Sequence, residues 1–182
     1  MNQLSPSDET RSQSGSVSNK KLELLFRDAR GELLGTLFYL IGNMEDAKDA
    51  LQETFLKCWR KQDQVDSIEN LKAWVFRIAL NTGRDIRKTA WKRRRESFAE
   101  DAIMVSTSKS PEMDLVQKEQ IQNLRQAVLR LRPKEQEVFL LRQNGNLTYE
   151  QIAEATGMPI GTVKTRMRAA INRLRESVGE QS

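Results

Sequence analysis

Apolar residues recur every three or four positions along most of this chain, which is the period of amphipathic helices. In the first half, this pattern predicts three helices that begin at the capping residues Asn19, Asn43 and Ser67. Gly42 is predicted to end the first helix. The second helix carries a nearly ideal apolar stripe at Met44, Ala47, Leu51, Phe55 and Cys58. The third has its apolar side at Leu71, Trp74, Val75, Ile78, Thr82 and Ile86.

Polar stretches divide these helices into domains. Residues 1–18 are rich in Ser, Gln, Asn and Asp and have little to bury, which predicts a disordered tail. Residues 97–109 lose the helical period and include a run of Ser and Thr, which indicates a flexible linker. We therefore predict an all-α fold with two small helical domains at 19–96 and 110–178, the second of which opens at Pro111.

The second domain is predicted to end in a helix-turn-helix between Leu147 and Arg175. Thr148 and Gln151 match a capping box at its start, and Gly157 supplies the tight turn. The second helix of the pair is basic. It carries Lys164, Arg166, Arg168, Arg173 and Arg175, and no Asp or Glu lies between them. In a helix-turn-helix, this second helix enters the major groove of DNA. An ordinary helical hairpin with a solvated basic face is the alternative.

The distribution of charge is more informative than its sum. Thirty Lys and Arg stand against 25 Asp and Glu, a net charge of +5. Apart from Asp85, the charged residues from Arg84 to Arg95 are all basic, which marks a second positive patch for nucleic acid. Trp91 lies within it, where it could stack on unpaired bases or anchor the core; for Trp74 we favour the core. The second helix instead carries an acidic face, which could equally be a solvated surface.

Residue types that are rare or absent exclude several kinds of function. The lone Cys58 rules out an internal disulfide, suits a reducing compartment and is expected to be buried. The lack of histidine removes Cys/His metal sites and histidine-based catalysis, and we expect no catalytic residue, metal or cofactor. The sequence has no apolar run near the ~20 residues of a membrane span and no signal peptide. We therefore expect a cytoplasmic protein.

Three segments resemble bacterial RNA polymerase sigma factors of the sigma-70 family, in the extracytoplasmic-function (ECF) group. They are Asp46–Trp59, Leu71–Lys88 and the segment from Leu131 to Arg175, in the family's order and spacing. The resemblance implies a factor, not an enzyme, that binds core RNA polymerase and directs it to promoters. The first domain would melt the downstream (−10) element, and the second would read the upstream (−35) element.

The resemblance also assigns residues to each contact. Core polymerase, through its basic clamp helices, would bind Asp46, Asp49, Gln52, Glu53 and Lys57. The melted downstream strand would be held by Lys72, Arg77, Asn81, Arg84, Arg87 and Lys88, with flipped bases against residues 61–69. In the upstream duplex, Lys164, Thr165 and Arg168 would contact base edges. The phosphates would be contacted by Thr162, Arg166 and Arg173. The base preferences of both elements stay open.

Two other functions remain as alternatives to this interpretation. A stand-alone helix-turn-helix regulator would bind DNA without polymerase, and its first domain would then sense a ligand or form dimers. A nuclease or recombinase is disfavoured, because Asp46 and Asp49 have no second carboxylate group placed to meet them. An anti-sigma factor is a further partner that the resemblance implies, although no binding motif for one is evident in the sequence.

Overall fold

The computed structural model describes residues 18–97 and 115–179, and their side chains at 18–89 and 121–177. The first domain is helical at 18–28 and continues as α2 (Arg30–Ile41), α3 (Met44–Trp59), η1 (Gln62–Ser67) and α4 (Leu71–Ser97). The second contains α5 (Leu115–Leu129), α6 (Pro133–Gln143), α7 (Tyr149–Thr156) and α8 (Ile160–Gly179). No strand occurs within these two ranges, which agrees with the predicted all-α class.

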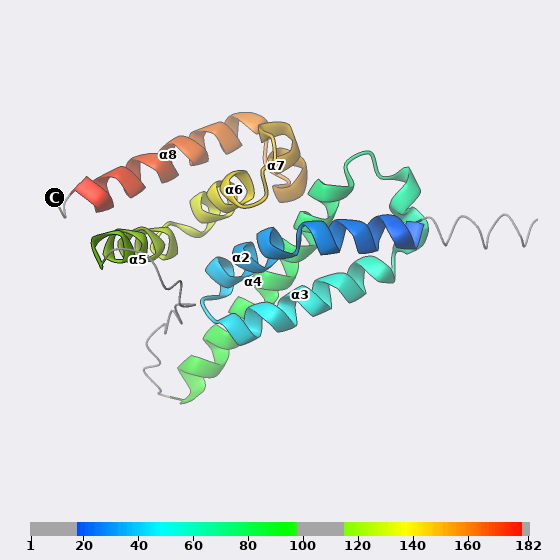
Figure 1. Ribbon diagram of the computed structural model, residues 1–182, viewed down its shortest axis with the longest axis horizontal. Coiled ribbons are helices and arrows are strands. Elements are labelled where there is room, and N and C mark those ends of the chain that lie inside the picture. Colours follow the sequence, from blue (N-terminus) through cyan, green and yellow to red (C-terminus); the bar gives the residue numbers. More distant parts are fainter. Residues whose placement is uncertain (1–17, 98–114, 180–182) are drawn as a thin grey trace, which may run out of the picture.

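Each domain is a small bundle, and Figure 1 shows the two lying against each other. In the first, α2, α3 and α4 all contact one another. In the second, α8 packs against α5, α6 and α7. The predicted linker falls mostly outside the described residues, as do the predicted tail, apart from Ser18, and the start of a helix at Pro111.

Several helix ends follow the predicted capping residues. The Asn43 side chain accepts hydrogen bonds from the backbone N–H of Glu45 and Asp46, which begins α3. Thr148 and Gln151 exchange the two hydrogen bonds of a capping box at the start of α7. Gly157 ends α7 with φ +71°, a left-handed conformation in which a side chain is strained.

Two of the predicted caps, Asn19 and Ser67, are wrong. Residue 18 is already helical, so Asn19 lies inside the first helix rather than at its cap. Ser18, which the sequence placed in the tail, is buried and donates a hydrogen bond to Asp66. Asn70, not Ser67, caps α4 by accepting from the backbone N–H of Ala73. Ser67 instead donates to the Gln64 carbonyl and closes the 3₁₀ turn of η1.

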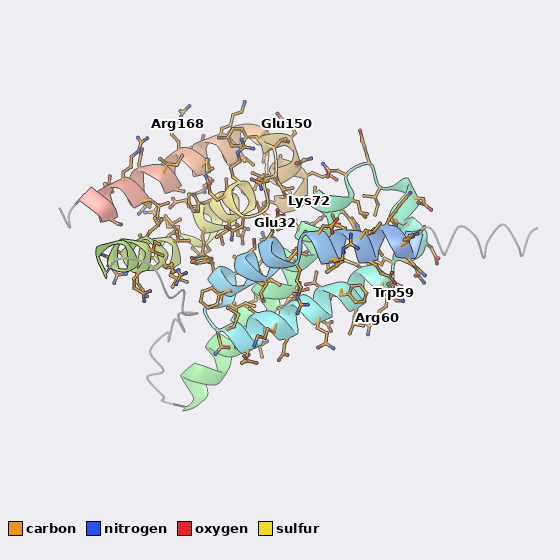
Figure 2. All side chains as sticks on the ribbon, in the orientation of Figure 1. Glu32, Trp59, Arg60, Lys72, Glu150 and Arg168 are labelled. Carbon is orange, nitrogen blue, oxygen red and sulfur yellow. The ribbon has the colours of Figure 1, made fainter. Side chains whose placement is uncertain are left out.

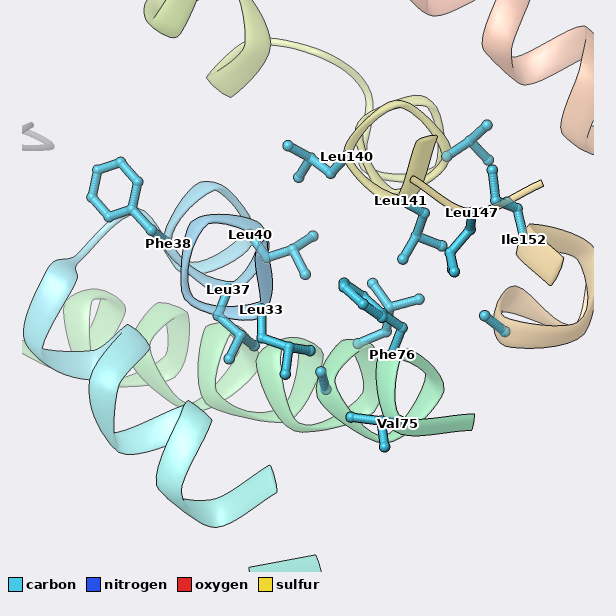
Figure 3. Packing of buried hydrophobic residues seen from close by; sticks show 14 of the residues in the cluster. Leu33, Leu37, Phe38, Leu40, Val75, Phe76, Leu140, Leu141, Leu147 and Ile152 are labelled. Carbon is cyan, nitrogen blue, oxygen red and sulfur yellow. The ribbon is translucent and has the colours of Figure 1, made fainter. Parts of the chain in front are cut away.

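A single apolar core runs through both domains. Figure 3 shows Phe76 of α4 pointing toward Leu141 and Leu147 of the second domain, while Leu140 of α6 approaches Leu40 of α2. All five of these side chains are buried. An added Cβ at Gly145 would lie 3.3 Å from the Phe76 ring and 2.7 Å from the Leu141 carbonyl oxygen, so only glycine fits there. The sequence predicted an apolar face on α4 but did not indicate this second buried side.

Candidate polymerase and nucleic-acid interfaces

Helix α3, which carries the predicted acidic residues, lies on the side of the first domain away from α8 (Figure 1). Asp49 and Gln52 are exposed, whereas Asp46 and Glu53 are half-buried. The half-buried Lys57 ammonium lies 3.7 Å from Glu53 and donates a hydrogen bond to Thr82 of α4. Lys57 therefore links α3 to α4, and Asp49 and Gln52 are the most accessible members of the predicted set.

An exposed apolar side chain accompanies this acidic face. Leu56 is 40% exposed and stands three and four residues after Glu53 and Gln52, so all three share one side of α3. Farther along, Trp59 stacks at a tilt on Phe55, which meets Phe26 edge to face. The sequence analysis did not select Leu56 as a contact residue. Its position outside the apolar stripe of α3 could have indicated that it is exposed.

The predicted strand-binding residues of α4 lie in different surroundings. Arg77, Asn81 and Lys88 are exposed, and Arg87 is half-buried. Lys72 is instead paired, since its ammonium lies 2.7 Å from the Glu32 carboxylate of α2. Figure 2 shows these two side chains together between their helices.

Arg84 is the other member of this set that already has an acidic partner. Its guanidinium donates to both carboxylate oxygens of Glu137, in α6 of the second domain, at 2.8 and 2.6 Å. Burial by itself raises the pKa of the Glu137 carboxyl. The hydrogen bonds and charges of Arg84 and Lys134 outweigh that effect and hold this pKa below its ordinary value. The carboxylate is therefore ionised at neutral pH.

The connection before α4 is ordered by one aspartate. Asp66 in η1 accepts hydrogen bonds from Lys21 and Ser18, both at 2.6 Å. These bonds, followed by the Lys21 charge, hold the pKa of Asp66 below its usual range. Val65 is buried beside it. The segment expected to face flipped bases is thus a 3₁₀ turn attached to the first helix rather than an irregular polar loop.

The predicted recognition helix α8 presents its basic side to solvent. Lys164, Thr165 and Arg168 are exposed, and Figure 2 shows Arg168 on the outer side of the helix. Thr162, Arg166 and Arg173 are half-buried.

One of these basic residues has a structural partner. The Arg173 Nε lies 2.9 Å from a carboxylate oxygen of the buried Glu135 in α6, a close ion pair whose angle falls outside hydrogen-bond geometry. Arg173 therefore joins α8 to α6 whether or not it also meets a phosphate.

Family comparisons agree with this arrangement. Residues 25–95 match the family Sigma-70 region 2, and residues 121–174 match Sigma-70, region 4. The chain is 30% identical to the ECF RNA polymerase sigma factor SigW of Bacillus subtilis, over 79% of each protein. It is 31% identical to the ECF RNA polymerase sigma factor RpoE of Cereibacter sphaeroides, over 84% of this chain and 83% of that protein. The chain belongs to the sigma-70 family, in its ECF group.

A solved structure supports the same membership. The sigma factor RpoE of Bartonella quintana, in complex with the anti-sigma factor NepR, has a TM-score of 0.75 and 26% identity. The match covers 88% of this chain and 98% of that one. ECF sigma factors are transcription initiation factors, not enzymes, that direct core RNA polymerase to promoter DNA, and this confirms the predicted function over a stand-alone regulator. In the described part of the chain, no helix has the length and apolarity to span a bilayer.

A basic residue of the sigma factor's second domain was missed by the sequence analysis. Arg142 of α6 donates to the Leu147 carbonyl, and its guanidinium lies 5.5 Å from the Tyr149 ring centroid. It thereby holds the loop that leads into the helix-turn-helix. The pKa of nearby Glu150 is lowered first by hydrogen bonds from its own backbone N–H and from Thr148, and then by the Lys164 and Arg142 charges.

The single cysteine of this sigma factor should be chemically inert while the chain is folded. Cys58 is fully buried, and burial raises the pKa of its thiol to about 12, an effect that the Lys61 charge only partly offsets. The thiolate is the reactive form, and with this raised pKa nearly every Cys58 thiol stays protonated at pH 8. We expect an aromatic disulfide reagent to label the chain only in denaturant, as followed by absorbance. Rapid labelling of native protein would contradict this burial.

Proposed function

We propose that this sigma factor divides promoter recognition among three surfaces on separate helices. The acidic side of α3 binds a basic surface of core polymerase, the basic side of α4 holds the melted downstream strand, and α8 reads upstream duplex DNA. The observation that carries this proposal is the separation of charge. Accessible acidic side chains lie on α3 and accessible basic side chains lie on α8. The two helices are on opposite sides of the molecule (Figure 1). One chain can therefore engage an enzyme and a nucleic acid together.

On α3, the exposed Leu56 completes the proposed polymerase surface. Protein interfaces typically have an apolar centre inside a polar rim. Leu56 supplies that centre, while Asp49, Gln52 and Glu53 supply the surrounding polar and acidic groups. Electrostatic complementarity to a basic partner would speed association and orient the docking.

On α4, the downstream strand is proposed to run over Arg77, Asn81, Arg87 and Lys88, toward the 3₁₀ turn before the helix. Arg77, Asn81 and Lys88 are exposed and able to meet phosphates. Lys72 and Arg84 would join them after leaving their carboxylate partners. The Asp66 tether keeps the turn in place, so flipped bases would meet a preformed surface.

On α8, Lys164, Thr165 and Arg168 are proposed to face base edges in the major groove. All three are exposed on the second helix of a helix-turn-helix. Thr162, Arg166 and Arg173 are proposed at phosphates, and Arg173 does this while also supporting the domain through Glu135.

We further propose that this protein acts in the cytoplasm, where RNA polymerase works, and that an anti-sigma factor regulates it. The support for regulation is the likeness to the Bartonella quintana factor, whose structure holds NepR.

A transcription assay tests the whole proposal. Transcript starts sequenced after overexpression would identify the promoters, which then serve as templates for run-off transcription with purified core polymerase. We expect transcripts from these templates only when core polymerase and this protein are both present. Full protection of the promoter by the protein alone, with no transcript on adding core polymerase, would contradict the proposal.

A further inference from the structure

The two DNA-reading domains are joined by a buried ion pair. Only 1% of the Glu137 side chain and 22% of the Arg84 side chain are exposed. Arg84 donates from Nε and Nη2 to the two carboxylate oxygens, which is the bidentate fork of a strong, directional contact. Lys134 adds a third hydrogen bond from the rim, at 3.2 Å. The pair thus fills the guanidinium edge that a phosphate group would need.

Apolar contacts surround this pair and hold the domains together. Helix α4 packs against α7, and α2 packs against α6. Phe76 is completely buried, and its ring lies against the loop at Gly145. Figure 3 shows the ring pointing toward Leu141 and Leu147. Because the Glu137 carboxylate is buried, loss of Arg84 would leave a buried charge without full compensation.

We propose that the Arg84–Glu137 contact is an autoinhibitory latch that holds this sigma factor in a closed form. This inference rests on the proposed function, in which the Arg84 side of α4 binds the melted strand. In the closed form, the Glu137 carboxylate takes the place of a strand phosphate on Arg84. The same contact keeps α6 against α2 and α7 against α4, so the upstream and downstream readers cannot move apart.

The latch predicts how affinity depends on the closed population. If the melted strand binds only the open form, its apparent affinity equals its affinity for the open form multiplied by the fraction of chains that are open. A change that weakens the latch should therefore increase apparent affinity without adding a contact to DNA. Core polymerase, by holding each domain on its own surface, would shift the population in the same direction.

The first test replaces Glu137 with Gln, which keeps the side chain's size but removes its charge. Two quantities are measured on the full chain: the separation of fluorophores placed on the two domains, and the Kd for a labelled single-stranded DNA oligonucleotide. We expect Glu137→Gln to lengthen the separation and to tighten strand binding about three- to tenfold. Circular dichroism checks that the helix content is unchanged.

Glu135→Gln is the matched control. Glu135 is in the same helix and equally buried, but it pairs with Arg173 inside the second domain. Its substitution removes the same charge without touching the interface between domains. We expect the wild-type separation and wild-type strand affinity.

A second test locks the closed form chemically. An ideal Cβ on Gly35 of α2 lies 3.3 Å from the Asn144 side-chain nitrogen at the end of α6, so cysteines at both positions would face each other. The native Cys58 is buried and should not compete for the reagent. We expect Gly35→Cys/Asn144→Cys, joined by a short reducible crosslinker, to lose strand binding and to regain it on reduction.

Each outcome decides the inference. An unchanged separation in Glu137→Gln would overturn the latch, and a longer separation with unchanged strand affinity would overturn its inhibitory role. If Glu137→Gln does not fold, a crosslinked chain that binds strand as tightly as the reduced chain would overturn the proposal by itself. The separation is measured without DNA or polymerase, so it reports on the latch even where run-off transcription fails.

Discussion

Charge reversal on α3 is expected to abolish recruitment of the polymerase. A chain carrying Asp49→Lys and Glu53→Lys should bind core RNA polymerase at least about a hundredfold more weakly than wild type. Like charges brought together across an interface cost several kcal/mol, and about 1.4 kcal/mol corresponds to a factor of ten. Asp49 is exposed and Glu53 is half-buried beside Lys57, so neither side chain belongs to the buried core of the domain. Fluorescence anisotropy with purified core polymerase measures the loss.

Two further measurements distinguish an effect of the α3 surface from an effect of the chain's net charge. The control, Glu23→Lys with Asp28→Lys, changes the net charge equally at exposed positions of the first helix and should bind core polymerase normally. The upstream-duplex affinity of the full α3 variant should match that of the control, since both variants carry the same net charge and α8 is unchanged in both. Equal loss in the control and in the α3 variant would show that total charge, rather than the α3 face, determines binding.

The second large effect is expected on α8. Lys164→Ala with Arg168→Ala should weaken upstream duplex binding by roughly 2–6 kcal/mol, since each good base contact contributes about 1–3 kcal/mol. Both side chains are exposed, so their truncation leaves the buried face of α8 at Val163 and Met167 intact. Core polymerase binding by the α3 surface should remain. Competition with unrelated duplex measures the specific part of the loss.

A matched pair of basic residues in the same domain provides the control. Arg130 and Arg132 are exposed between α5 and α6, and the Arg132 side chain makes no capping hydrogen bond. Their substitution by Ala removes two charges without removing a proposed base contact. If it weakens specific binding as much as the α8 variant does, then α8 attracts DNA only by its charge and does not read sequence.

Local chemistry explains which parts of this fold were predictable. The α3 cap at Asn43, the capping box at Thr148 and the turn at Gly157 depend on neighbours within four residues, and all three were predicted correctly. The α4 cap was misplaced because both Ser67 and Asn70 are residue types that cap helices. They differ only in the folded chain, where the Ser67 hydroxyl donates to the Gln64 carbonyl of the 3₁₀ turn and Asn70 is left to cap α4. The exposed basic side of α8 was likewise evident from helical spacing.

The contacts of individual site residues were less predictable. Spacing placed Lys72 and Arg84 on the polar side of α4, but it could not show that Glu32 and Glu137 reach them. Leu56 was passed over although its position outside the core stripe was a signal. Arg142 was passed over because a pattern alone does not separate an arginine that holds a loop from a solvated one.

By itself, the sequence determined the helices, the two family regions and therefore the role of this protein in starting transcription, because these follow from short-range periodicity and residue type. Only the tertiary structure decided that the two domains share a core. Phe76 meets the Gly145 loop, and Arg84 meets Glu137 53 residues away, through contacts between segments that no local pattern relates. The pairing of distant helices depends on shape and on the burial of one carboxylate, and these exist only once the chain has folded.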